Sequence, residues 1–264
     1  MARRQTLADP ENRQWKYILL LQDGGAYFGD HALIAANTLR CLNASFEVVC
    51  VEPNPEQRLL LNENAHMNHL QDFIALEDAV LWSTEGLQFD LENTDSHASV
   101  LQVDSAPYLS KTINSIVKNI GFDSLSLLML DIEGSEESAL QGSNSLLEMT
   151  EAEAPKIIFE VHRKYVDWTN GLVNTPIVQN LANYGYHMFA LRDCQCNWEL
   201  DLQKPELIPL EDVLLEGPPH GFNIVASKDK QFFSKEHFDF VKGVSPKYLR
   251  HRSPSLHRPL IRLS

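Results

Sequence analysis

Short apolar runs alternate with segments of helical periodicity along most of this chain. Runs such as YILLL (17–21), FEVVCVE (46–52), LSLLML (125–130) and KIIFEVH (156–162) have the length of buried strands and are too short to cross a bilayer. Repeated strand–helix units predict a mostly parallel sheet with helices on both faces. Right-handed crossovers make such a sheet doubly wound, so we expect an α/β fold.

Seven strands are expected in this sheet. Besides the four runs above, they are FIALE (73–77), YHMFAL (186–191) and GFNIVAS (221–227). Two short alternating segments, GLQFDLE (86–92) and ASVLQVD (98–104), indicate an insertion that decorates the sheet. Asn54, Pro55 and Gln57 have the spacing of a capping box at a helix start, Pro176 opens another helix, and residues 135–149 are expected to form one more.

Composition limits the classes of function. The net charge is −14, although residues 241–264 hold six Lys or Arg and no acid, so the rest of the chain is strongly acidic and is not expected to bind nucleic acid. We therefore expect one domain over residues 15–228, an N-terminal extension (1–14) and a basic C-terminal extension (229–264).

The start of the chain and its cysteines predict where it works. The first 14 residues lack an apolar h-region, and four cysteines do not suggest a disulfide framework, so we expect a cytoplasmic protein with no membrane span. Cys194 and Cys196 have no second Cys or His pair at ligand spacing, so no metal site is expected.

Acidic residues follow most of the expected strands. Ligands of doubly wound sheets bind beyond the carboxyl ends of the strands, so these residues form the candidate site. The segments concerned are Asp23 to Asp30, Glu52, Asp78, Asp131 to Gly134, and Glu160 to His162. Acids gathered at one edge disfavour a pyrophosphate and favour a cation or a set of hydroxyls.

The glycine turn after the first strand is not a dinucleotide fingerprint. Its glycines are Gly24, Gly25 and Gly29, whereas a dinucleotide site requires G-x-G-x-x-G and a helix start open to phosphate. Glu52, at the end of the second strand, fits a ribose diol, although it could also act as a cap. Acids for an ammonium group, glycines for close backbone approach and Glu52 for the ribose together suit S-adenosylmethionine.

An ordered set of motifs resembles the FkbM-type methyltransferase family. The motifs are QDGGAYFGDH, VCVEPNPEQRLLLNENAHMN, EDAVLWSTEGLQF, TINSIV, LLMLDIEGSEESALQG and IIFEVH, and they cover residues 17–227. The chain departs from the family pattern at Gly24, where an apolar residue is usual, and at Tyr27, where Asn is frequent. The resemblance implies a class I, Rossmann-like fold that uses S-adenosylmethionine, releases S-adenosylhomocysteine and usually methylates oxygen atoms of natural products, glycans or lipids.

The resemblance also implies roles for individual residues. The turn from Gly25 to Gly29 would approach the methionine moiety, Glu52 the ribose, and Asp78 with Ala79 the adenine. The full set of cofactor-binding residues expected is Asp23, Gly25, Ala26, Tyr27, Gly29, Asp30, His31, Glu52, Pro53, Asn54, Asp78, Ala79 and Asp131.

Methyl transfer to a hydroxyl requires that its proton leave, and a base within hydrogen-bond reach accelerates this step. His162 is the first candidate for that base, followed by Glu133 and Asp131. A carboxylate acceptor needs no base, and His162 or Arg163 would then position the anion. Tyr165, Trp168 and Trp198 are candidates for stacking on the acceptor, although they could equally anchor their loops.

Two functions therefore remain open from the sequence. The first is an O-methyltransferase that modifies a hydroxyl or carboxylate of a small-molecule, glycan or peptide natural product. The second is a nucleotide-binding protein of the same fold that has lost its chemistry or uses NAD. The acidic strand ends favour the first.

Overall fold

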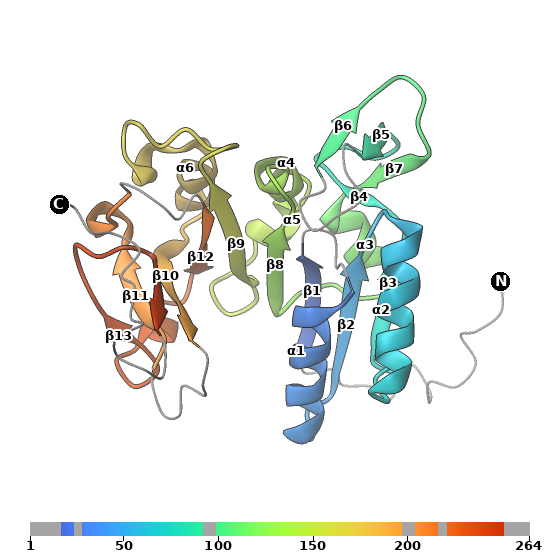
Figure 1. The fold of residues 1–264 in the computed structure, drawn as a ribbon, viewed down its shortest axis with the longest axis horizontal. Coiled ribbons are helices and arrows are strands. Elements are labelled where there is room, and N and C mark those ends of the chain that lie inside the picture. The colour runs from blue at the N-terminus through green and yellow to red at the C-terminus, as the bar shows by residue number, and fades with distance from the viewer. Residues whose placement is uncertain (1–16, 24–27, 92–98, 197–203, 216–220, 251–264) are drawn as a thin grey trace.

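The computed structural model describes residues 17–23, 28–91, 99–196, 204–215 and 221–250 (Figure 1). Its centre is one twisted sheet with helices on both faces, which confirms the α/β expectation. Five strands pair in parallel in the order β3–β2–β1–β8–β9. Their bounds are Ile74–Glu77 (β3), Phe46–Val51 (β2), Tyr17–Asp23 (β1), Leu127–Asp131 (β8) and Lys156–His162 (β9).

The sheet continues beyond β9 with antiparallel strands. β12 (Gly221–Ser227) pairs antiparallel with both β9 and β10 (His187–Cys196). Three further strands extend the edge: β11 (Glu206–Pro209), β13 (Asp239–Phe240) and β14 (Lys247–Arg250). The described sheet thus has ten strands rather than the seven predicted. The added strands have two to four residues each, which is too short for an alternating pattern to identify them.

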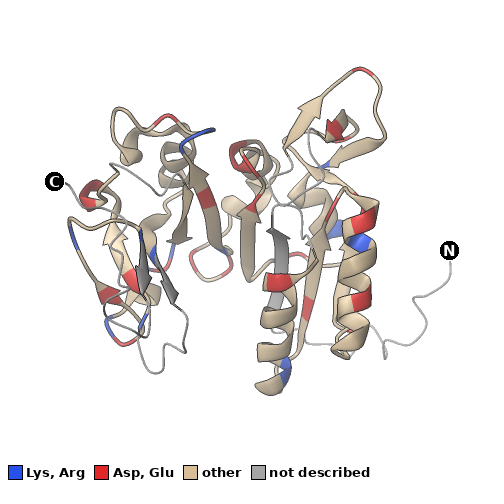
Figure 2. Ribbon diagram, in the orientation of Figure 1, with Lys and Arg blue, Asp and Glu red and all other residues tan. Residues whose placement is uncertain are grey.

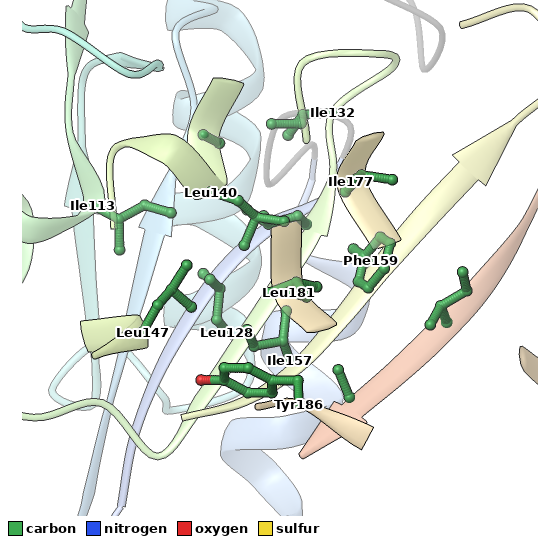
Figure 3. Close-up of a cluster of buried hydrophobic side chains, with 14 of the residues drawn as sticks. Ile113, Leu128, Ile132, Leu140, Leu147, Ile157, Phe159, Ile177, Leu181 and Tyr186 are labelled. Atoms are coloured by element: carbon green, nitrogen blue, oxygen red, sulfur yellow. The ribbon is translucent and has the colours of Figure 1, made fainter. Parts of the chain in front are cut away.

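Two helices cover one face of the sheet and four cover the other. α1 (Asp30–Cys41) and α2 (Pro55–Met67) bury small and apolar residues such as Ala36 and Leu61 against β2. The opposite face carries α3 (Ile113–Asn119), α4 (Glu136–Gln141), α5 (Asn144–Leu147) and α6 (Pro176–Asn183). There Leu128 and Phe159 of the sheet meet Leu140, Leu147 and Leu181 of these helices in the main core (Figure 3). The burial of apolar side chains on both faces stabilises the sheet, and the sheet in turn holds the strand ends in position.

The insertion between β3 and α3 forms a second, small sheet in the order β4–β7–β5–β6. Its strands are β4 (Val80–Leu81), β5 (Gln88–Leu91), β6 (Val100–Gln102) and β7 (Tyr108–Lys111), so both predicted strands of the insertion are present. An ion pair between Lys111 Nζ and Glu77 Oε2, at 2.7 Å, ties this sheet to β3.

Two details differ from the sequence-based expectations. The helix expected over 135–149 is broken between α4 and α5 at Gly142, where a Cβ would lie 2.3 Å from the Trp82 carbonyl oxygen. Asn54 caps α2 by accepting from the Glu56 N–H, but its own N–H donates to Glu52 Oε1. The Asn54 N–H, which a capping box would have bonded to Gln57, is therefore accepted by Glu52.

Three short 3₁₀ turns complete the described chain: η2 (Leu172–Asn174), η3 (Leu210–Asp212) and η4 (Lys230–Phe233). Residues 230–250, assigned from the sequence to the C-terminal extension, contribute η4, β13 and β14 to the edge of the sheet. In the described ranges, no helix is long and apolar enough to span a bilayer. Nor do the described side chains include a group of three His, Cys, Asp or Glu that could hold a metal ion.

Candidate active site

Glu52 is the most buried acid at the carboxyl edge of the sheet. It follows β2 directly, and only 3% of its surface is exposed. Its Oε1 accepts the Asn54 N–H at 2.7 Å, and its own N–H donates to the Glu77 carbonyl at 3.0 Å. A buried carboxylate needs such donors, because burial removes the water that would otherwise solvate it. The position expected to bind a ribose diol therefore holds a carboxylate in a fixed orientation.

Arg58 of α2 was not expected at this site. Its Nη1 donates to the carbonyl oxygens of Glu52 and Pro53 at 2.7 and 2.6 Å. The same nitrogen forms an ion pair with Asp78 Oδ1 at 2.7 Å. Arg58 thus ties the turn after β2 to the segment after β3. The sequence could have identified Arg58 by its place in the first turn of the helix after Pro55, because a side chain there lies close to the preceding turn.

The segment after β3 carries the two residues expected to meet an adenine ring. The Asp78 side chain is 67% exposed and is held by Arg58. Ala79 is buried in the main core, at 1% exposure, so only its backbone can face a ligand.

The described part of the glycine turn begins after residue 27. Gly25, Ala26, Tyr27 and the side chain of Asp23 lie outside the described residues, although the Asp23 backbone pairs in register with Asp131. Gly29 has φ 92°, and a Cβ there would lie 3.0 Å from Leu61 Cγ, so the packing of α1 on α2 already requires glycine. Asp30 and His31 open α1, with Asp30 Oδ1 and His31 Nδ1 3.9 Å apart.

The loop after β8 is held by the buried side chain of Glu136, the first residue of α4. Glu136 Oε1 accepts the Ile132 N–H at 2.8 Å, and its Oε2 accepts the Gly134 N–H at 3.1 Å. Burial raises the Glu136 pKa to about 7, against the opposing effect of these amide donors. Glu133 and Gly134 have φ values of 52° and 101°, so the loop turns sharply just beyond Asp131.

Glu160 of β9 was not singled out as a catalytic candidate from the sequence. Gly221 of the neighbouring strand leaves room for it, because a Cβ there would lie 2.2 Å from Glu160 Oε1 and 2.7 Å from His162 Cδ2. Burial, followed by the charges of Asp131, Glu133 and Glu136, raises the Glu160 pKa to about 8, while Lys247 opposes the shift. The alternation along FEVH could have identified Glu160 from the sequence, since it places the side chains of Glu160 and His162 on one face of the strand.

The hydrogen bonds of His162 define which of its ring nitrogens carries a proton. Its Nδ1 accepts the Lys164 N–H at 3.0 Å. A nitrogen that accepts a hydrogen bond has no proton, so the neutral ring carries its proton on Nε2 and presents a donor there. His162 is thus equipped to donate to an oxygen, whereas the neighbouring Glu160 is equipped to accept a proton.

Tyr165 joins the loops that follow β8 and β9. A Cβ on Gly134 would lie 2.5 Å from Tyr165 Cγ, so the tyrosine ring lies directly on this glycine. The ring centroid of Tyr165 is 5.6 Å from that of His162. Glu133 lies close enough to raise the pKa of the Tyr165 hydroxyl, although burial is the larger cause. Tyr165 therefore forms the wall between the acids of the strand ends and the segment after β9.

The remaining aromatic candidates differ in their surroundings. Trp168 is a core residue at 8% exposure, with its ring centroid 5.7 Å from that of Phe222 and the Arg163 guanidinium carbon 5.7 Å from its ring. The stacking surface expected for it is largely covered. Trp198 lies outside the described residues.

A pocket of about 740 Å³ opens beside Tyr165. We call it the loop pocket. Its walls are Leu215 and most of the segment from Arg163 to Gly171. Arg163 and Lys164 supply positive charge to it, and Figure 2 shows this basic segment just past the acidic strand ends. Small-molecule sites commonly have volumes of ~300–1,000 Å³, so the loop pocket has the size of an acceptor site.

The strand order reverses between β1 and β8, and acids follow the strands at this edge, where ligands of such α/β sheets usually bind. A family model for the methyltransferase FkbM domain matches residues 23–188. The chain therefore belongs to the FkbM methyltransferase family, as its motifs had indicated.

The solved structures to which the chain is similar include three methyltransferases. The FkbM methyltransferase from Methylobacillus flagellatus has 16% identity and a TM-score of 0.41, covering 80% of this chain and 43% of its own length. The chain thus spans less than half of that protein. A precorrin-6y C5,15-methyltransferase from Geobacter metallireducens has 10% identity and a TM-score of 0.42, covering 81% and 80%. An O-methyltransferase family 2 protein from Planctomyces limnophilus, solved with apigenin, has 11% identity and a TM-score of 0.35, covering 80% and 51%. No curated protein matches the chain.

Proposed function

We propose that the chain is an S-adenosylmethionine-dependent O-methyltransferase whose acceptor atom is a hydroxyl oxygen. The observation that carries this proposal is the buried, hydrogen-bonded carboxylate of Glu52 at the end of β2, aligned with Asp131 and Glu160 at the ends of β8 and β9. Oxygen acceptors at three strand ends fit the hydroxyls and ammonium group of the donor, whereas a pyrophosphate would be repelled by them. When bound, S-adenosylmethionine supplies a methyl group activated by a sulfonium sulfur.

The charges around Glu160 favour a hydroxyl acceptor over a carboxylate. Asp131, Glu133 and Glu136 already raise its pKa, so an anionic acceptor oxygen at this position would meet the same repulsion. A neutral hydroxyl does not. In the reaction the acceptor oxygen forms a bond to the methyl carbon, the carbon–sulfur bond breaks, and the hydroxyl proton passes to Glu160. The His162 ring lies beside the Glu160 carboxyl, so in this proposal it would help to orient the same oxygen.

Cofactor binding is the direct test of this proposal. In isothermal titration, S-adenosylhomocysteine should bind the wild-type chain, and NAD should not. Glu52→Gln keeps an oxygen for the Asn54 N–H but removes the negative charge, so it should weaken binding by ~1–3 kcal/mol. Glu85→Gln, an exposed acid on the small-sheet insertion, is the matched control and should bind as the wild type does. Binding of NAD in place of S-adenosylhomocysteine would overturn the proposal.

A further inference from the structure

Tyr165 contacts both loops that border the candidate active site. Its N–H donates to the His162 carbonyl at 2.9 Å, which fixes it to the turn that directly follows β9. Its ring lies on Gly134 of the loop after β8, where a Cβ would lie 2.5 Å from Tyr165 Cγ. The loop after β8 lies where the strand order reverses, which is the usual ligand position in such sheets. Tyr165 is therefore placed to control the shape of this loop.

The Tyr165 hydroxyl has a partner on each side. It accepts a hydrogen bond from Lys164 Nζ at 2.9 Å and donates one to the Glu133 carboxylate. A tyrosine hydroxyl has one proton, so the proton is directed to Glu133 while the oxygen faces the ammonium group. Both bonds have a charged partner, and such bonds are about twice as strong as neutral ones. The ammonium, hydroxyl and carboxylate thus form a chain that joins the two loops.

Glu133 has a backbone conformation that is sterically unfavourable for a residue with a Cβ. Its φ of 52° lies in the left-handed region. Of the other described residues, only Asn43 and His69 share a positive φ without being glycine, and they lie in the turns after α1 and α2, where helices commonly end with a left-handed residue. Glu133 instead follows a strand at the edge where ligands bind. A conformation of this kind persists only where its surroundings impose it.

The contacts that impose this conformation come from two directions. Glu136 accepts the Ile132 N–H at 2.8 Å and the Gly134 N–H at 3.1 Å, so it holds the backbone before and after Glu133. Neither bond involves the Glu133 side chain, which accepts from the Tyr165 hydroxyl. This hydroxyl is therefore the contact through which the segment after β9 acts on the strained residue.

We propose that Tyr165 is a positioning residue: its hydroxyl holds Glu133 in the left-handed conformation, and this conformation gives the loop after β8 the shape that binds the methyl donor. The inference rests on the proposed function and gives Tyr165 a role in donor binding in place of stacking on the acceptor. Without the hydroxyl the loop relaxes toward a negative φ. Only the fraction of molecules that keeps the strained conformation then binds the donor with full affinity.

Two substitutions of Glu133 separate backbone strain from the loss of its carboxylate. Glu133→Ala and Glu133→Gly both remove the carboxylate, but only glycine adopts a positive φ without strain. In isothermal titration, Glu133→Ala should bind S-adenosylhomocysteine about tenfold more weakly than the wild type, whereas Glu133→Gly should bind it as the wild type does. Equal affinities of the two variants would overturn the inference, because the conformation of residue 133 would then not matter for binding.

Removal of the hydroxyl should matter only where residue 133 is strained. Tyr165→Phe keeps a ring on Gly134, and it should weaken S-adenosylhomocysteine about tenfold in the wild-type chain but not in the Glu133→Gly chain. Tyr184→Phe, which loses a hydroxyl bond to Asn144 Oδ1 at 3.4 Å, is the matched control and should keep the wild-type affinity. An unchanged affinity of Tyr165→Phe, or an equal loss in both chains, would refute the role of the hydroxyl. Failure of the wild type to bind S-adenosylhomocysteine would overturn the proposed function instead, and the inference with it.

Discussion

Glu160 combines two properties that a general base at neutral pH requires. Its carboxyl lies over Gly221 next to the His162 ring, and its pKa is raised to about 8. A base works best when its pKa is near the working pH, so the raised value makes this carboxyl more basic than an ordinary one. His162 was the first candidate for the base; because its Nδ1 accepts the Lys164 N–H, we propose Glu160 for this role instead.

Replacing Glu160 should change both the rate and its pH dependence. With a base of this pKa, the wild-type rate should rise with pH and level off above about 8, because only the ionised carboxyl accepts a proton. Glu160→Gln should lower the rate constant at saturating acceptor by ~10²–10⁴-fold and flatten the profile. Glu85→Gln serves as the control and should keep the wild-type profile. If Glu160→Gln retained the same pH dependence, another group would be the base.

Gly134 is required for a different reason, which is the close approach of Tyr165. A Cβ would lie 2.5 Å from Tyr165 Cγ, and φ is 101°. Gly86 has a similar φ of 76° with nothing within 4 Å of a Cβ, so it isolates backbone strain from overlap. In urea unfolding, Gly134→Ala should lower the free energy of unfolding by ~1–3 kcal/mol more than Gly86→Ala does. Equal losses would mean that the Tyr165 ring moves aside without cost.

At the scale of elements, α2 holds the cofactor edge through Arg58. The helix begins just after Glu52, and the Arg58 guanidinium reaches back to the Glu52 and Pro53 carbonyls and across to Asp78. At the opposite end of the sheet, Arg40 of α1 performs an equivalent task, since its Nη1 donates to the Asn68 and His69 carbonyls at 3.2 Å. Arg58 and Arg40 therefore make similar helix-to-turn contacts, but only Arg58 lies at the candidate active site.

Arg58→Gln and Arg40→Gln should have different effects on ligand binding. Both variants lose a charge-assisted link between a helix and a turn, so both should unfold at lower urea concentrations than the wild type. Only Arg58→Gln should weaken S-adenosylhomocysteine, by ~1–2 kcal/mol, because only its turn carries Glu52. Calorimetric titration measures this difference. A similar loss of affinity in Arg40→Gln would show that the effect reflects general destabilisation.

The sequence predicts those elements whose residues carry a local pattern. Strands such as β8 and β9 are continuous apolar or alternating runs, and the acids that end them are read directly from DIEG and FEVH. What it cannot predict depends on contacts between distant segments. The break at Gly142 depends on the Trp82 carbonyl, and the raised pKa of Glu160 depends first on its burial and then on acids of the neighbouring strand and loop. Arg58 likewise gains its partners only when α2 folds back on β2.

At the scale of the whole molecule, the raised pKa values of two carboxyls near the strand ends make the stability of the fold depend on pH. Glu136 and Glu160 have pKa values raised to about 7 and about 8 from a value of 4.5, and burial is the main cause for both. A folded state with raised carboxyl pKa values holds more protons than the unfolded chain between those limits. The stability that they contribute is therefore complete below about pH 4.5 and is lost as the pH rises through about 7 and 8.

Glu160→Gln should reduce this loss of stability with pH. A neutral amide has no charge to bury, so the fall in the free energy of unfolding between about pH 6 and about pH 9 should be ~1–2 kcal/mol smaller than in the wild type, allowing for partial exposure of the carboxyl. Urea titrations at both pH values give the two differences. In Glu85→Gln, whose side chain is exposed on the insertion, the free energy of unfolding should fall as far as in the wild type. An equal fall in all three proteins would mean that the Glu160 carboxyl ionises on folding as readily as in the open chain, and that the acids of β8 and its loop do not act on it.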